Sequence, residues 1–322
     1  MSRKGQTAMF PTDSAVSLRG VTKTFEQWQR DNTGKGLLKN LLKPEKRVVT
    51  ALDDVSFEIG RGEFAAYAGP NGAGKSTTMK LLAGMLLPSS GEISALGLSP
   101  QKRRRALMRR LGVLFGNRTE LWWDHPVIQS FAWKKAVWDI PDGQYRENLA
   151  MVTELLDLGD LLKTFARELS LGQRMRADLA MLLLHSPELI LLDEPTLGLD
   201  VVAKRQMIRF LRQLNEREGT TIVVTSHDMD DLEEMARRIL LISHGKIAFD
   251  GDFAALREEL GCTKTAIVHF QDGTRREIAY QETKRVLREI AELDGVADVR
   301  FTQTSLEEGL ANLFARWKER GR

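Results

Sequence analysis

The sequence predicts an α/β fold followed by a small α+β domain. Three patterns support this prediction: a glycine-rich loop between a strand and a helix, an apolar strand that ends in two acids, and a hairpin pattern after residue 261. With 322 residues, the chain is long enough for two cores. We expect the large domain at residues 14–260 and the small one at 262–322.

The composition excludes several classes of protein. There are 47 basic and 44 acidic residues, with a formal net charge of +3, so no polyanionic partner is implied for the chain as a whole. The single cysteine, Cys262, excludes an intramolecular disulfide and a cysteine-based metal site. No signal-peptide pattern begins the chain, and charged residues interrupt the most apolar window, 179–199. We therefore expect a cytosolic chain, with any membrane role supplied by a partner.

Residues 16–25 and 55–59 predict two antiparallel strands, and residues 26–50 form an insert between them. The leucines and cations of the insert have the spacing of an amphipathic helix. Two interpretations stay open: a solvated loop, or docking against a partner protein or an anionic membrane. The residues concerned are Arg30, Lys35, Lys39, Lys43, Lys46 and Arg47, with Leu37, Leu38, Leu41 and Leu42.

A phosphate-binding loop is predicted at residues 69–76, between a strand at 63–68 and a helix at 77–83. The loop has the pattern Gly-x4-Gly-Lys-Ser, in which backbone N–H groups wrap a polyphosphate and the helix N-terminus adds positive partial charge. Lys75 would reach the terminal phosphates, and Ser76 would hold Mg²⁺. The sequence therefore predicts nucleotide binding.

After this loop we expect an edge strand at 91–96, a helix at 101–110 and a buried strand at 112–115. The helix is strongly basic, which fits either a solvated face or a nucleic-acid surface; the lack of interleaved aromatic residues favours the solvated face. Its cations are Lys102, Arg103, Arg104, Arg105, Arg109 and Arg110. In the next loop, Trp122 and Trp123 either fill a local core or anchor an interface.

Two acids follow a second apolar strand. Residues 127–165 predict helices, Ser170 can cap a helix at about 173–185, and residues 189–192 predict a strand buried on both faces. Asp193 and Glu194 end this strand, where buried charge is costly unless a cation or a mechanism accounts for it. Asp193 would hold Mg²⁺ through a water, leaving Glu194 to orient or deprotonate an attacking water.

The last third of the large domain continues the α/β pattern. A helix is predicted at 201–217, a strand at 221–225, and His227 just after it, where open sheets bind ligands. Further predicted strands are 239–243 and 246–249.

The small domain begins with a hairpin pattern. Its strands at 264–270 and 274–280 flank Asp272-Gly273, a strong turn signal. A helix at about 281–293, a strand at 296–302 and a helix opened by the capping pattern of Ser305 and Glu308 complete it.

Together, residues 69–76, 169–173, 189–196 and 198–200 with His227 resemble an ABC-type ATPase, the ATP-binding subunit of an ABC transporter. The resemblance covers about residues 14–260. It implies a P-loop NTPase of ABC type, with an antiparallel β subdomain, a helical subdomain at about 117–186, ATP and Mg²⁺ as cofactors, and a head-to-tail dimer.

The resemblance also implies roles for individual residues. Glu194 is the implied catalytic base, and His227 contacts the γ-phosphate. The implied metal residues are Ser76 and Asp193. The implied nucleotide-binding residues are Phe25, Gly69, Pro70, Asn71, Gly72, Ala73, Gly74, Lys75, Ser76 and Thr77, with Ser170, Gly172, Gln173 and Asp200 acting across the dimer. To both sets we add Asn117 as an expectation of our own.

Three positions depart from the family pattern. Leu171 replaces the first glycine of the signature Leu-Ser-Gly-Gly-Gln. Phe25, the expected adenine-stacking aromatic, is separated from residues 51–53 by the insert. Gly116 or Asn117 stands where a glutamine is usual, and we expect Asn117 to take its role beside the γ-phosphate and Mg²⁺.

The insert and the C-terminal domain resemble those of exporter ATPases whose separate permease has six helices per protomer. Residues 306–314 resemble a segment near the ends of those subunits. The implied partners are a second ATPase subunit and a membrane permease, with no nucleic acid, which places the chain at the cytoplasmic face of the plasma membrane. Alternatives are an importer ATPase with a regulatory C-terminal domain, or a soluble ABC protein acting on ribosomes or DNA.

Overall fold

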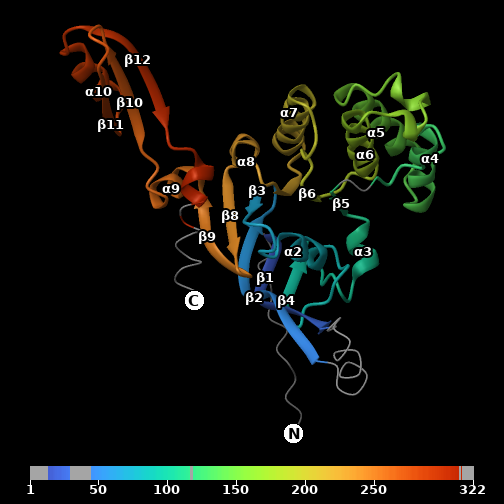
Figure 1. The fold of residues 1–322 in the computed structure, drawn as a ribbon. Helices are drawn as coiled ribbons and strands as arrows, with labels where there is room; N and C mark the ends of the chain where they lie inside the picture. The colour runs from blue at the N-terminus through green and yellow to red at the C-terminus, as the bar shows by residue number, and fades with distance from the viewer. Residues whose placement is uncertain (1–13, 30–44, 117–118, 312, 314–322) are drawn as a thin grey trace, which may run out of the picture. The chain divides into compact units, whose positions relative to one another are not determined.

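The computed structural model describes residues 14–29, 45–116, 119–311 and 313 (Figure 1). Its chain separates into two compact units, one of residues 1–227 and 231–250 and the other of residues 228–230 and 251–322. The domain boundaries expected at residues 260 and 262 stay a prediction. Among the described residues, no helix is both long and apolar enough to cross a membrane.

An antiparallel sheet of order β2-β1-β4 begins the first unit. Its strands are β1 (Ser14–Gln29), β2 (Glu45–Gly60) and β4 (Ser90–Ala95). The two predicted N-terminal strands are confirmed, but both are longer than expected, because cross-strand pairing continues outward from Phe25 and Val49 to Gln29 and Glu45.

The predicted bounds of the insert at residues 26–50 are therefore corrected at both ends. Residues 26–29 and 45–50 are strand, so the insert bounds expected at 26 and 50 are wrong, while the amphipathic helical pattern around the leucines stays a prediction. The β-branched run Val48-Val49-Thr50 explains this, because such residues favour a pleated surface. The leucines and the lysines at 35, 39 and 43 lie outside the described residues.

A six-stranded sheet forms the centre of the first unit, in the order β5-β6-β7-β3-β8-β9. The strands are β3 (Phe64–Ala68), β5 (Leu111–Phe115), β6 (Leu189–Asp193), β7 (Thr221–Thr225), β8 (Arg238–Ser243) and β9 (Lys246–Asp252). The first five pair in parallel, and their apolar runs are largely buried, as expected for parallel strands. The carboxyl ends of β3, β6 and β7 therefore share one edge of the sheet, where the predicted site residues follow them.

The helices of the first unit mostly match the predicted ones. They are α2 (Lys75–Leu82), α3 (Arg104–Met108), α4 (Val127–Val137), α5 (Asp142–Leu155), α6 (Leu171–Leu183), α7 (Val201–Glu218) and α8 (Met229–Met235), the last crossing into the second unit. Short 3-10 turns occupy Leu161–Lys163 and Ala166–Glu168. The helix expected at 101–110 is wrong in length, since residues 101–103 form turns and Arg110 leaves the helix to pair with Glu188 at 2.6 Å.

The second unit contains a three-stranded antiparallel sheet of order β11-β10-β12. Its elements are α9 (Phe253–Glu259), β10 (Lys264–Phe270), β11 (Arg275–Tyr280), α10 (Thr283–Ala291) and β12 (Val296–Gln303). Ala266 and Val268 of the sheet pack with Val286 and Ile290 of α10. Ser305 Oγ accepts the Glu308 N–H at 3.1 Å, as the capping pattern predicts, and residues 306–311 are helical. The predicted small α+β fold is confirmed.

Candidate nucleotide site

The loop between β3 and α2 depends on glycine at two positions. A Cβ at Gly69 would lie 2.1 Å from the Ile242 carbonyl oxygen, and one at Gly74 would lie 2.7 Å from the Ala51 carbonyl oxygen. Both glycines also have positive φ, 156° and 118°. No side chain caps α2 at Gly74, so the first N–H groups of the helix can bind an anion.

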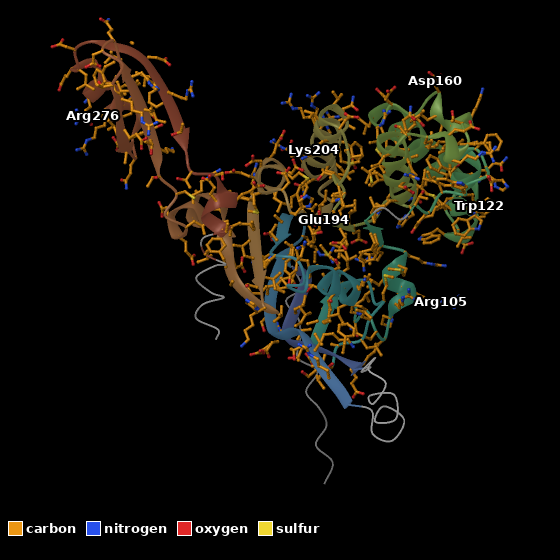
Figure 2. The ribbon with its side chains drawn as sticks, in the orientation of Figure 1. Arg105, Trp122, Asp160, Glu194, Lys204 and Arg276 are labelled. Atoms are coloured by element: carbon orange, nitrogen blue, oxygen red, sulfur yellow. The ribbon has the colours of Figure 1, made fainter. Side chains whose placement is uncertain are left out.

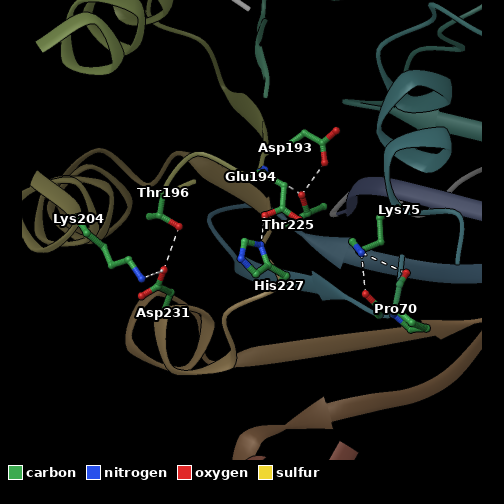
Figure 3. Close-up of polar contacts among 10 residues, drawn as sticks. Pro70, Lys75, Asp193, Glu194, Thr196, Lys204, Thr225, His227 and Asp231 are labelled. Carbon is green, nitrogen blue, oxygen red and sulfur yellow. Dashed lines mark hydrogen bonds and ion pairs between the residues drawn. The ribbon is translucent and has the colours of Figure 1, made fainter. Parts of the chain in front are cut away.

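Lys75 contacts the backbone of this loop (Figure 3). Its side chain is buried, and Nζ donates to the carbonyl oxygens of Gly69 at 2.6 Å and Pro70 at 3.3 Å. Burial lowers the pKa of Lys75, while the charges of Glu194 and Asp193 raise it. A cation held among carbonyl groups, beside helix N–H groups and near two acids, fits a polyphosphate with a bound divalent metal.

Asp193 ends β6 and Glu194 follows it, and both are held by Thr225, which the sequence did not single out. Thr225 Oγ1 donates to Asp193 Oδ1 at 2.6 Å and accepts the Glu194 N–H at 3.0 Å (Figure 3). The backbone of Glu194 has a φ of 58°, a left-handed conformation that is uncommon for a residue with a side chain. Thr225 lies opposite Asp193 in the parallel pairing of β7 with β6. Its role could therefore be predicted only with knowledge of the strand order.

The two predicted catalytic residues lie together at this edge of the sheet. His227 Nδ1 is 2.7 Å from Glu194 Oε2, at the position labelled Glu194 in Figure 2. The side chain of Glu194 is mostly buried, whereas that of His227 is 60% exposed. A glutamate in hydrogen-bond contact with a histidine can accept a proton while the histidine contacts a bound phosphate.

The signature residues cap their own helix. Ser170 Oγ accepts the Gln173 N–H at 3.3 Å, and Gln173 Oε1 accepts the Ser170 N–H at 2.9 Å, so the predicted cap is confirmed. Leu171 turns toward its own chain, because a Cβ at Gly198 would lie 2.9 Å from Leu171 Cδ2. This packing accounts for a leucine in place of the usual glycine.

The remaining predicted residues are distributed around this edge and on the antiparallel sheet. Asp200 Oδ1 caps α7 by accepting the N–H groups of Val202 and Ala203, both at 2.9 Å. Phe25 is half-buried on β1, with Lys23 Nζ 4.9 Å from its ring centroid. Asn117 lies outside the described residues, so its role stays a prediction.

The other residues of the predicted set belong to the phosphate loop and the signature segment. Asn71, Gly72 and Ser76 are exposed, and Pro70 and Thr77 are partly exposed. Ala73 is buried in the core, and a Cβ at Gly172 would lie 3.2 Å from Ala203 Cβ. The exposed hydroxyl of Ser76 is therefore open to a ligand of the loop.

A buried acid on α6 was also missed by sequence reasoning. Asp178 Oδ1 accepts hydrogen bonds from Thr119 Oγ1 at 2.8 Å and from the Glu120 N–H at 3.0 Å. Burial raises the pKa of Asp178 to about 6, with the hydrogen bonds from Thr119 and Glu120 opposing the shift. Asp178 thus joins the signature helix to the loop that follows β5. Its role depends on tertiary contacts, and the helical pattern carries no signal for it.

We expect Asp178→Asn to change how stability depends on pH. Because the folded-state pKa of about 6 lies above the ordinary 3.8, the native protein keeps a proton that the unfolded chain releases. The contribution of Asp178 to the free energy of unfolding should therefore fall by about 2 kcal/mol as pH rises from 4 to 6, and Asp178→Asn should lack this contribution. The amide oxygen can still accept both hydrogen bonds. Urea unfolding at pH 4.5 and 7.5 measures the difference.

The parent and the variant must be compared because His185 changes the free energy of unfolding with pH in the opposite direction. Burial lowers the pKa of His185 to about 4, so its contribution to stability rises with pH. Asp160→Asn, at an exposed position, is the matched control. If the parent and Asp178→Asn lose stability equally between the two pH values, Asp178 does not titrate in this range.

Comparisons with known proteins show which family the chain resembles. A family model described as ABC transporter matches residues 52–197. The chain is 30% identical over 214 residues to the ABC transporter ATP-binding protein NatA of Bacillus subtilis (strain 168), covering 66% of this chain and 87% of NatA. It is 32% identical to the methionine import ATP-binding protein MetN of Carboxydothermus hydrogenoformans, covering 67% of this chain and 65% of MetN. It is 33% identical to the probable multidrug ABC transporter ATP-binding protein YbhF of Escherichia coli (strain K12), covering 62% of this chain and 34% of YbhF.

A solved structure supports the fold. The ATP-binding cassette MJ0796, described as dimeric and bound to ADP and Pi in a post-hydrolysis state, matches with a TM-score of 0.62 and 23% identity. The match covers 74% of this chain and 98% of that chain. Both the predicted fold class and the predicted ATPase activity are confirmed. The chain belongs to the ABC transporter family, as an ATP-binding subunit that hydrolyses ATP.

Proposed function

We propose that this ATPase powers export through a separate membrane permease, at the cytoplasmic face of the membrane. The observation that carries the proposal is the second unit, an antiparallel sheet with helices. This α+β fold differs from the all-β barrel common as an importer appendage. The relative named as a multidrug transporter is consistent with export.

In the proposed mechanism, each residue of the nucleotide site has a separate role. Lys75 and the loop N–H groups bind the β- and γ-phosphates, and Glu194 accepts the proton of the attacking water. His227 contacts the γ-phosphate. The Ser76 hydroxyl and the Asp193 carboxylate supply the oxygen ligands that Mg²⁺ prefers, and Thr225 holds that carboxylate in position. Bound Mg²⁺ would neutralise charge developing on the phosphates.

We infer a head-to-tail dimer in which the signature segment of one subunit contacts ATP bound to the other. The N-terminus of α6 supports this role, because a helix N-terminus stabilises an anion. Ser170, Gly172 and Gln173 lie at that end. Asp200 lies at the equivalent end of α7, where its contact would cross the dimer. The dimeric state of the MJ0796 cassette is consistent with this assembly.

Exposed aromatic rings support a permease contact on the helical segment. Trp122 and Trp123 are 39% and 50% exposed, and the ring centroid of Trp122 lies 5.7 Å from that of Trp133. Trp122 also meets His125 edge to face, and the contacting rings of Trp122, His125 and Trp133 are all exposed on the helical segment that carries the Trp122 label in Figure 2. Half-exposed tryptophans are typical of interface anchors.

The basic residues of the insert are the second proposed contact, with the permease or the anionic lipid around it. Charge reversal at Lys35, Lys39 and Lys43 should reduce the amount of permease that co-purifies, because each cation near an anionic surface contributes about 1 kcal/mol. Basal ATPase activity should stay within twofold of the parental rate. Charge reversal at Lys102, Arg104 and Arg105, on another exposed segment, is the control. Equal co-purification of the permease with both triple variants would favour a solvated loop.

The importer alternative has one specific observation in its favour, the similarity to the relative named for methionine import. A role on nucleic acid is disfavoured at the basic segment, because Arg110 is bound to Glu188 and Arg109 lies 3.4 Å from Asp139. The predicted helix there is also only five residues long. These contacts support the solvated interpretation.

The direction of transport can be tested with the chain and its membrane partner. We expect a six-helix membrane protein, encoded beside the chain, to co-purify with it. Inverted membrane vesicles should accumulate its transported compound when ATP is added outside, and vesicles with Glu194→Gln should not. ATP-dependent loss from inverted vesicles, together with a neighbouring solute-binding protein, would identify an importer.

A further inference from the structure

A buried carboxylate lies next to the candidate hydrolytic residues. Asp231 of α8 is 6% exposed, and Thr196, after β6, is 4% exposed. Asp231 Oδ2 accepts a hydrogen bond from Thr196 Oγ1 at 2.9 Å and lies 2.9 Å from Lys204 Nζ of α7 (Figure 3). Removing a carboxylate from water is costly unless partners of this kind compensate the charge. We name Thr196, Lys204 and Asp231 the Asp231 clasp.

The clasp joins three segments that each carry a proposed site residue. Thr196 follows Glu194 closely on the same loop, and Asp231 lies one helical turn beyond His227. Lys204 lies one turn beyond Asp200, and its backbone N–H donates to the Asp200 carbonyl oxygen at 2.9 Å. One carboxylate oxygen of Asp231 therefore connects three segments. They are the loop of the candidate base Glu194, the loop of the candidate phosphate contact His227, and the start of α7.

The contact between the two catalytic candidates needs such support. His227 is 60% exposed, and an exposed ion pair or hydrogen bond of this kind contributes little to holding two loops together. Thr196 and Asp231 are buried and Lys204 is partly buried, and replacement of a buried charged group by apolar residues often leaves stability unchanged. The value of the clasp to the protein is therefore better explained by the geometry that it imposes than by stability.

We propose that the Asp231 clasp positions Glu194 against His227 for ATP hydrolysis and ties this arrangement to the start of α7 through Lys204. Asp231, Thr196 and Lys204 are positioning residues, since none of them needs to touch the nucleotide. The inference rests on the roles proposed for Glu194 and His227. A misplacement of about 1 Å at a catalytic group can reduce the rate about 100-fold, so a clasp on the same two loops has a measurable effect.

Thr196→Val in the full chain is the direct test, because it removes the hydroxyl and keeps the shape. We expect kcat for ATP hydrolysis to fall about 10-fold or more, with the ATP Kd within twofold of the parental value. Thr196→Ser restores the hydroxyl and should return kcat to within twofold. Thr153→Val, which removes a hydroxyl that donates to the Leu149 carbonyl oxygen at 2.6 Å on α5, is the matched control and should leave kcat unchanged.

A double-mutant cycle separates positioning from general damage. If the clasp acts through the contact of Glu194 with His227, Thr196→Val should cause no further loss of kcat in the His227→Ala background. Losses that multiply would overturn the proposal, as would a kcat within twofold of the parental rate for Thr196→Val alone. Hydrolysis at the parental rate by Glu194→Gln would instead refute the catalytic assignment itself. An inactive Glu194→Gln combined with an unaffected Thr196→Val would refute only the clasp.

Discussion

Glu194→Gln is expected to lower the rate of ATP hydrolysis about 10²- to 10⁴-fold, because removal of a general base typically has an effect of this size. The substitution is isosteric and leaves Lys75 and the phosphate loop intact, so ATP binding should be retained. ATP should consequently accumulate in a trapped dimer. Phosphate release measures the rate, and light scattering of the purified chain with and without ATP measures the dimer.

Glu218→Gln is a matched control, since Glu218 is an exposed glutamate at the end of α7. It should hydrolyse ATP at the parental rate and form no trapped dimer. Loss of hydrolysis in Glu194→Gln without any ATP-dependent dimer would separate the catalytic proposal from the dimer proposal. Full activity of Glu194→Gln would contradict the role of Glu194.

Lys75→Ala should act on binding instead. The lysine Nζ already donates to two loop carbonyls, so a terminal phosphate has only to replace these acceptors with charged ones. A hydrogen bond to a charged group contributes about 1.5 to 3 kcal/mol, so the ATP Kd should rise about 10- to 100-fold or more. Equilibrium dialysis with ATP measures this change.

Lys75→Met keeps most of the apolar stem and should show the same loss, which distinguishes lost charge from lost packing. Lys80→Ala, an exposed lysine on the same helix, should bind ATP normally. ATP affinity unchanged in both Lys75 variants would mean that the loop N–H groups alone hold the phosphates.

The parallel strands could be predicted closely, and the outer part of the antiparallel hairpin of β1 and β2 could not. Strands β3 and β7 are continuous apolar runs bounded by turn residues, and such runs end where burial ends. The outer part of β1 and β2 consists of mixed residues, including Glu26 and Arg47, whose strand conformation comes from pairing across the hairpin. Pairing between distant segments leaves no periodic pattern in either strand.

The same reason separates the site residues that could be predicted from those that could not. Gly69, Lys75 and Glu194 belong to local motifs whose spacing carries the chemistry. By contrast, the roles of three other residues depend on hydrogen bonds to side chains that are distant in the sequence. These residues are Thr225, Asp231 and Asp178. Their partners become evident only once the strand order and the helix packing are known.

The central position of β3 has a consequence for the order of events during synthesis. This strand leaves the ribosome early, but both of its neighbours, β7 and β8, begin after residue 220. The close contact of Gly69 with Ile242 can form only after β8 has been synthesised. At typical elongation rates, the loop that carries Lys75 emerges about 10 s or more before the strands that flank it. A nascent chain truncated before β7 therefore carries the complete phosphate-loop motif without the sheet that shapes it, and this apolar β3 strand is exposed to chaperones during that interval.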